Sequence, residues 1–217
     1  MNTGVSMEII DISVPLDQDL PIWPDSPGFH LESLQKIEDG ADANISELRC
    51  DVHTGTHIDA PSHFVQDGTT VDGISLESTI GPATVKKVPA DVKTITAKTL
   101  DALDISDDVT RLLLQTRNSS LWAESRSEFR SDYTALAPGA ATWIVNHGIR
   151  CIGVDYLSVQ HFGDDPSTHR ILLQNEVVII EGLNLSGVPE GEHELLCMPL
   201  KIADAEGAPA RVALKVR

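Results

Sequence analysis

Residues 51–64 read DVHTGTHIDAPSHF, a stretch that sets histidines and an aspartate around a glycine and a proline. In a straight strand, which rises about 3.3 Å per residue, His53 and His57 would stand about 13 Å apart and could not share one ion. A helix is disfavoured because β-branched threonines flank Gly55, which is itself a poor helix former, and because Pro61 would interrupt the backbone. The sequence therefore predicts an irregular segment that bends at Gly55.

A bend at Gly55 would let His53, His57 and Asp59 converge on one cation. Imidazole and carboxylate groups are ligands that suit zinc or manganese. His63 follows shortly after and could be a further ligand or a free base beside the metal. A single histidine is more often an ordinary surface residue, but histidines clustered with an aspartate in one loop indicate a metal or catalytic site.

The composition indicates one domain with few possible anionic partners. The chain of 217 residues is 41% hydrophobic, which is enough for one substantial core, and we expect a single domain over residues 1–217. Lys+Arg of 16 against Asp+Glu of 33 gives a formal net charge of -17, so neither nucleic acid nor an anionic membrane is expected as a partner. Long apolar runs and an export signal are not evident, and we expect a cytoplasmic protein.

The apolar pattern predicts many strands, with helices between only some of them, which is typical of an α+β fold with a mixed sheet. Strands are expected at residues 8–14, 30–37, 45–52, 83–88, 111–116, 151–154, 176–180, 194–200 and 211–216. Helices are expected from Thr96 to residue 103, at 138–146 and at 168–174, the last with Ser167 as its cap. The strand at 45–52 alternates and should be half-buried. The polar segment 118–137 is predicted to be a mobile loop or a subunit contact.

His169 and Glu181 are two further candidates for the site. His169 lies on the helix predicted at 168–174, and Glu181 follows the next strand. A helix that packs back on its own strand would bring the two side chains together. From the residues alone, however, such a pair is more often found on an ordinary surface.

The sequence as a whole resembles the cyclase-type metal-dependent hydrolases, a family that includes bacterial kynurenine formamidase. The most specific part of the resemblance is HTGTHIDAPSHF at residues 53–64. The other matching segments extend over nearly the whole chain: DISVPL, PIWP, IGVDYLSV, PSTHRILL, VVIIEGLNL and VPEGEHELLCMPLKI.

This resemblance implies a swivelling β/β/α fold, assembly as homodimers or homotetramers, and a site with one or two divalent metal ions per subunit. Zinc is the expected ion, with manganese as the alternative. His63 would act in proton transfer, and Trp23 would form an aromatic wall of the substrate pocket. The implied metal ligands are His53, His57, Asp59, His169 and Glu181.

One segment departs from the formamidase pattern. Residues 159–165 read VQHFGDD where the formamidases have a shorter segment that is acidic and contains proline. The departure puts the substrate in doubt more than the metal. His161 lies in this segment and is interpreted as a loop histidine, with an approach to the site as the alternative.

The expected function is metal-dependent hydrolysis of an amide, with N-formylkynurenine as substrate and kynurenine and formate as products. A metal lowers the pKa of a bound water and polarises a carbonyl, and His63 could carry the proton to an arylamine leaving group. One alternative substrate is another aryl or cyclic amide, such as an isatin-like lactam. A non-catalytic metal-binding protein is a second alternative, although a free base such as His63 argues against a purely structural site. A serine nucleophile is disfavoured because the chain has no G-x-S-x-G.

Overall fold

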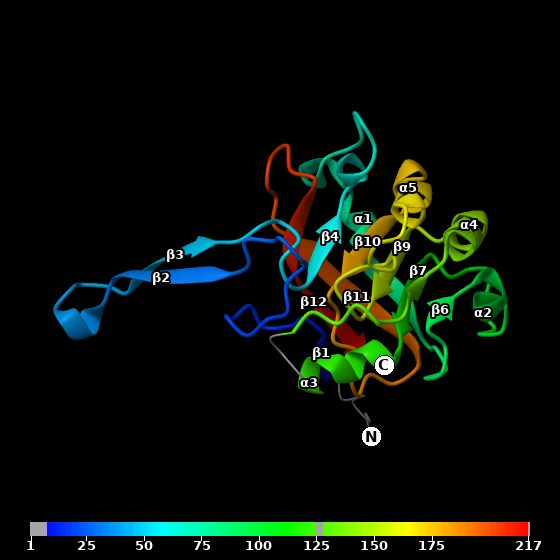
Figure 1. The fold of residues 1–217 in the computed structure, drawn as a ribbon, viewed down its shortest axis with the longest axis horizontal. Coiled ribbons are helices and arrows are strands. Elements are labelled where there is room, and N and C mark those ends of the chain that lie inside the picture. Colours follow the sequence, from blue (N-terminus) through cyan, green and yellow to red (C-terminus); the bar gives the residue numbers. More distant parts are fainter. Residues whose placement is uncertain (1–7, 125–127, 217) are drawn as a thin grey trace, which may run out of the picture.

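A closed β-barrel forms the centre of the computed structural model, which describes residues 8–124 and 128–216. Around the ring the strands follow the order β12-β11-β5-β7-β9-β10-β4, and β4 pairs back with β12 to close it (Figure 1). β1 pairs with β12 outside this ring. The strand bounds are β1 (Glu8–Asp11), β4 (His57–Asp59), β5 (Ile80–Lys87), β7 (Arg111–Gln115), β9 (Cys151–Val154), β10 (Val178–Glu181), β11 (Gly191–Pro199) and β12 (Gly207–Val216).

The sheet is mixed, as the sequence predicted. β5, β7, β9 and β10 run parallel to one another, whereas the other pairings in the ring are antiparallel. Parallel neighbours require crossover connections, and these carry α2 (Ala97–Asp101), α4 (Pro138–Asn146) and α5 (Ser167–Gln174). The three helices lie together on one side of the barrel (Figure 1). The α+β class is therefore confirmed, while the swivelling β/β/α type and the single domain over residues 1–217 stay predictions.

Two apolar cores lie on the two faces of the parallel strands. Leu113 of β7 packs in a cluster with residues of the antiparallel strands, such as Val212. Its neighbours Leu112 and Leu114 pack in a second cluster that contains Ile144 of α4. Alternating residues are thus buried on both faces, which explains why these strands read as continuous apolar runs.

Most predicted elements occur within a few residues of the expected bounds. β9 and α4 coincide with their predictions, and Thr96 caps α2 by accepting from the backbone N–H of Thr99. The predicted cap at Ser167 is wrong, because α5 begins at that residue and its N-cap is Pro166, which makes no side-chain cap hydrogen bond. The short elements that complete the described chain are η1 (Ile37–Asp39), η2 (Pro61–His63), η3 (Val71–Gly73), α1 (Leu76–Thr79), β6 (Thr94–Ile95), η4 (Arg117–Ser120), α3 (Leu121–Glu124) and β8 (Ala135–Leu136).

β2 (His30–Gln35) and β3 (Ile45–Arg49) form a two-stranded arm that projects away from the barrel (Figure 1). Every residue of both strands is exposed, including Leu31 at 57% and Leu48 at 53%. The prediction of a half-buried strand at residues 45–52 is therefore wrong. The alternation of apolar residues is real, but β3 pairs only with β2 and no other layer covers the ribbon.

The polar segment 118–137 is also more ordered than predicted. Its apolar side chains Leu121, Trp122 and Tyr133 are buried in a third cluster, and the indole N–H of Trp122 donates to the carbonyl of Leu183. This burial argues against a mobile loop in the described part, while the alternative of a subunit contact stays a prediction and residues 125–127 lie outside the described chain. These anchors are too irregularly spaced to show a helix or strand period. In the described chain, no helix combines the length and the apolar character needed to cross a bilayer.

The backbone makes a close contact with itself where β4 and β10 pair, between the turn before β4 and the turn after β10. Gly55 turns with φ +69 just before β4, and Gly182 turns with φ +70 just after β10. A Cβ atom at Gly182 would collide with the carbonyl group of Gly55. The hydroxyl of Thr56 donates to the carbonyl of Gly182 at 2.6 Å and accepts from the backbone N–H of Val14 at 2.9 Å. Three distant segments are therefore fixed to one another at this point.

We expect Gly182→Ala to destabilise the protein more than Gly187→Ala. Both glycines have a left-handed φ, but a Cβ at Gly187 would meet nothing within 4 Å, so the control reports backbone strain alone. The collision at Gly182 should cost about 1–3 kcal/mol beyond that strain. Urea denaturation of both variants measures the difference, and equal free energies of unfolding would show that the close contact is not a constraint.

Candidate metal centre

The bend at Gly55 places both ends of the histidine segment at one site. His57 and Asp59 lie two residues apart on β4 and are both buried, so their side chains share one face of the strand. His53 lies before the bend, and its Nδ1 is 2.9 Å from Oδ1 of Asp59. The predicted bend is confirmed, and it brings the three side chains together.

His169 and Glu181 complete the cluster from the other half of the chain. β10 pairs with β4 so that Glu181 stands opposite His57, and Glu181 Oε2 is 3.4 Å from His57 Nε2. His169 projects from α5, with its Nε2 3.3 Å from Glu181 Oε1 and 3.7 Å from Asp59 Oδ2. The five side chains that the resemblance named as ligands therefore meet in the structure.

The donor atoms fit a divalent cation. They form two groups that share Asp59, one with His53 and His57 and the other with His169 and Glu181, and within each group the atoms lie within 4.8 Å of one another. Ligand atoms on a tetrahedral zinc, bound at about 2.0–2.1 Å, stand about 3.4 Å apart. Within the described residues, buried His53 Nε2, His57 Nε2 and Asp59 Oδ2 have no hydrogen-bond partner. Buried polar atoms normally have one, so these three unpartnered atoms fit the role of ligands to a cation.

The electrostatics of the cluster also favour positive charge. Burial opposes a charge on His57, but the carboxylates of Asp59 and Glu181 overcome it and raise the pKa of His57 to about 10. Burial likewise opposes the charge of Asp59, yet its hydrogen bond to His53 and the nearby imidazole of His57 hold the pKa of this carboxyl well below its usual value. A cation bound between the carboxylates would take over the role of these protons.

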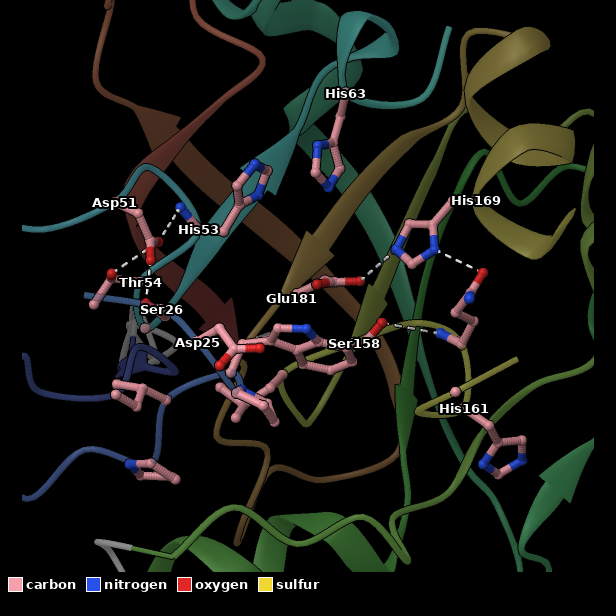
Figure 2. A pocket seen from close by; sticks show the side chains of 18 of the residues that line it. Asp25, Ser26, Asp51, His53, Thr54, His63, Ser158, His161, His169 and Glu181 are labelled. Atoms are coloured by element: carbon pink, nitrogen blue, oxygen red, sulfur yellow. Dashed lines mark hydrogen bonds and ion pairs between the residues drawn. The ribbon is translucent and has the colours of Figure 1, made fainter. Parts of the chain in front are cut away.

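His63 lies beside the cluster but belongs to neither group of donor atoms. It ends η2, and its ring stacks on His53 with the centroids 4.0 Å apart. Figure 2 shows the ring directed into the space between His53 and His169. Burial lowers the pKa of His63, so the neutral imidazole is the favoured form. A neutral imidazole next to the centre can accept a proton.

A cavity of about 480 Å³ opens in front of the cluster. Trp23 lies in its wall, is 38% exposed, and makes edge-to-face contacts with Phe129 and Phe162, each with centroids 5.3 Å apart. This position in the cavity wall argues against Trp23 being a plug of the core edge. Among the described residues, no lysine or arginine lines the cavity. Three aspartates do line it: Asp25, Asp51 and Asp164.

Sequence reasoning missed several residues around this cavity. Phe64 lines the cavity, Phe129 and Phe162 pack against Trp23 behind its wall, and the amide side chain of Gln160 contacts His169. The only sequence signal was that Gln160 and Phe162 lie in the segment that departs from the formamidase pattern. His161, from the same segment, lines the cavity but points away from the cluster, and its Nε2 forms a hydrogen bond of 3.0 Å with the hydroxyl of Thr94 (Figure 2).

Known proteins resemble this chain over nearly its whole length. The family model Cyclase, described as "Putative cyclase", matches residues 10–161. "Cyclase-like protein 1" of Arabidopsis thaliana is 38% identical over 216 residues, which are 95% of this chain and 84% of that protein. "Kynurenine formamidase" of Bacillus anthracis is 34% identical over 207 residues, 95% of this chain and 96% of that one. A solved structure described as a "Potential Metal-Dependent Hydrolase With Cyclase Activity" superposes with a TM-score of 0.84 at 32% identity, covering 98% of this chain and 99% of the other.

We expect Asp59→Asn to abolish stabilisation by metal, because Asp59 belongs to both groups of donor atoms. For the unaltered chain, zinc or manganese at a hundredfold excess over its Kd should stabilise the folded state by about 3 kcal/mol. Thermal unfolding of chelator-treated protein, with and without added metal, measures this effect. Asp67→Asn is the matched control, since it makes the same change at an exposed residue; an equal loss in both variants would contradict the assignment.

Proposed function

The chain belongs to the cyclase family, and on this basis we propose that it is a metal-dependent hydrolase of amide bonds whose active site is the buried cluster. The observation that carries this proposal is the convergence of unpartnered imidazole and carboxylate atoms at the base of an aromatic-walled cavity. A buried acidic and histidine cluster that opens to a cavity of this kind is typical of a catalytic metal site.

The cluster of donor atoms supports the metal chemistry of this proposal. One or two divalent ions, zinc or manganese, would be held by His53, His57, Asp59, His169 and Glu181. When bound, the metal would lower the pKa of a water toward 7 and polarise the carbonyl of the substrate.

His63 supplies the proton transfer in this proposal. Its imidazole is neutral because burial lowers its pKa, so it can accept a proton from the attacking water. The same imidazole can then donate that proton to the nitrogen that leaves. An arylamine nitrogen needs less assistance than an alkylamine nitrogen, so one histidine is sufficient for an aryl amide.

We take N-formylkynurenine as the first candidate substrate. The proposal is supported by the likeness to kynurenine formamidases and by Trp23 and Phe64, which line the cavity and offer aromatic surface to an aryl ring. Hydrolysis would give kynurenine and formate.

A cyclic aryl amide, such as an isatin-like lactam, is the second candidate. N-formylkynurenine carries a carboxylate, and no lysine or arginine lines the described part of the cavity to pair with it. A lactam carries no charge and would need no such partner. A metal-binding protein without turnover is the alternative from another class.

One assay separates these possibilities. The metal-loaded protein is mixed with N-formylkynurenine, an uncharged formylated arylamine and isatin, and both formate release and ring opening are followed. Formate from the first two supports the formamidase, ring opening alone supports the lactamase, and no turnover with any of them contradicts the hydrolase.

Homodimeric or homotetrameric assembly and a cytoplasmic location remain proposals. The arm of β2 and β3 supports an assembly with a second copy of the chain. A two-stranded ribbon is marginally stable alone in water, yet this one exposes Leu31, Leu34, Ile45 and Leu48. Cover from another subunit would bury this apolar surface.

We expect His63→Ala to keep the metal but to lose about 10²–10⁴ in kcat, the usual scale for the loss of a general acid–base group. His63 belongs to neither group of donor atoms, so the metal content of the purified variant should match that of the unaltered chain. The measurement pairs elemental analysis with turnover. Loss of metal together with activity would make His63 a ligand instead.

We expect Trp23→Ala to raise KM for an aryl amide by about tenfold, with little change in Tm. The indole is partly exposed in the cavity wall, so its loss should remove about 1 kcal/mol of aromatic contact with the substrate rather than core packing. Trp143→Phe is a useful comparison, because Trp143 packs on the helix side of the sheet. A large drop in Tm with unchanged KM for Trp23→Ala would place this residue in the core.

A further inference from the structure

The side chain of Gln160 is buried between the cavity rim and the metal cluster. Its Oε1 lies 2.9 Å from Nδ1 of His169, and its Nε2 donates to the backbone carbonyl of Asp164 at 3.3 Å. The backbone carbonyl of Gln160 accepts a hydrogen bond from the phenol of Tyr133 at 2.5 Å. The residue is only 8% exposed, and His169 in turn contacts Glu181, as Figure 2 shows.

The direction of these hydrogen bonds fixes the amide. A backbone carbonyl can only accept, so the NH₂ group of Gln160 must face Asp164. The oxygen of the amide is then the atom that faces His169, and an amide oxygen can only accept. His169 must therefore carry its proton on Nδ1.

This proton leaves the other ring nitrogen free. Nε2 faces Glu181 at 3.3 Å and Asp59 at 3.7 Å, and with the remaining proton held on Nδ1 a metal that replaced the Nε2 proton would meet an unprotonated nitrogen. An unprotonated imidazole nitrogen is the form that binds a metal.

The residue before Gln160 orients the second ligand from this half of the chain. The backbone N–H of Val159 donates to Oε1 of Glu181 at 2.6 Å. The other carboxylate oxygen, Oε2, then faces His57 Nε2 at 3.4 Å. The segment from Ser158 to Gln160 thus contacts both His169 and Glu181 and fixes the orientation of each.

We propose that Gln160 is a positioning residue for the metal centre: its side-chain amide, oriented by the carbonyl of Asp164, selects the tautomer and the ring orientation of His169. The inference rests on the proposed metal centre and adds to it a residue from the segment in which this chain departs from the formamidases. Hydrogen-bond partners of metal-bound histidines commonly change metal affinity by about 10–100-fold when they are lost.

The test compares two variants of Gln160 with a matched control. Gln160→Met keeps the length of the side chain but can neither accept from His169 nor donate to Asp164. Gln160→Glu retains an acceptor for His169. Gln115→Met removes a half-buried amide that also donates to a backbone carbonyl, that of Leu185, but that does not line the cavity. Affinity for Zn²⁺ is measured by competition with a chelator, and the visible absorption spectrum of the Co²⁺-loaded protein reports the ligand geometry.

We expect Gln160→Met to bind Zn²⁺ about 10–100-fold more weakly than the unaltered chain and to change the Co²⁺ spectrum. Gln160→Glu should restore affinity to within a few-fold, and Gln115→Met should leave both readouts unchanged. Thermal unfolding of the metal-free proteins is followed in parallel. We expect Gln160→Met and Gln160→Glu to have similar Tm values, so that a difference in Zn²⁺ affinity between them does not come from a general loss of structure. A Tm of Gln160→Met far below that of Gln160→Glu, with the weaker binding, would contradict a positioning role.

Two other outcomes would overturn the inference and are distinguishable. If the unaltered chain binds Zn²⁺ and Gln160→Met binds it equally well with the same Co²⁺ spectrum, Gln160 does not position His169, and the metal centre itself stands. If the unaltered chain binds neither ion, the proposed metal centre fails and the role of Gln160 fails with it.

Discussion

The close backbone contact between Gly55 and Gly182 is the constraint on which the site depends. β4 is only three residues long, and it joins β12 to β10 to close the barrel. Only a residue without a Cβ allows the turn after β10 to approach the turn before β4. The same approach sets Glu181 opposite His57. Barrel closure and assembly of the metal centre are therefore one structural event.

Burial of two carboxylates in the cluster is electrostatically unfavourable, and the imidazoles of the same cluster offset part of this cost. Two carboxylates, Asp59 and Glu181, lie buried in one small volume, and like charges at this distance repel strongly in a medium of low dielectric. In the protein alone, protons on His57 and His169 offset part of this repulsion, and the pKa of both imidazoles is raised although burial opposes it. A divalent cation offsets it more completely. The strain of the cluster without metal is thus a source of its affinity for metal.

The sequence predicted the parts of the site that are local in the chain. The bend at Gly55 and the convergence of the ligands in residues 53–59 follow from residue types and spacing alone. The sequence suggested that His169 and Glu181 meet, but their place beside His57 depends on the pairing of β10 with β4, which no local pattern encodes, so their assignment as ligands came from the resemblance. The exposed arm was missed because an alternating pattern shows which residues share a face and not whether anything covers it. Gln160 was missed because a single buried amide leaves no periodic signal.

The cavity in front of the cluster is lined by proposed ligands at its base and by the loop of Trp23 in its wall, and one residue joins these two parts. The carboxylate of Asp51 accepts from the backbone N–H of His53 at 2.9 Å, from the hydroxyl of Thr54 at 3.0 Å, and from the hydroxyl of Ser26. Ser26 lies in the proline-rich loop that presents Trp23 to the cavity. The aromatic wall is therefore fastened to the histidine segment itself. The position of Trp23 is thereby fixed relative to His53, and an aromatic ring bound against this indole would be held at a defined distance from the cluster.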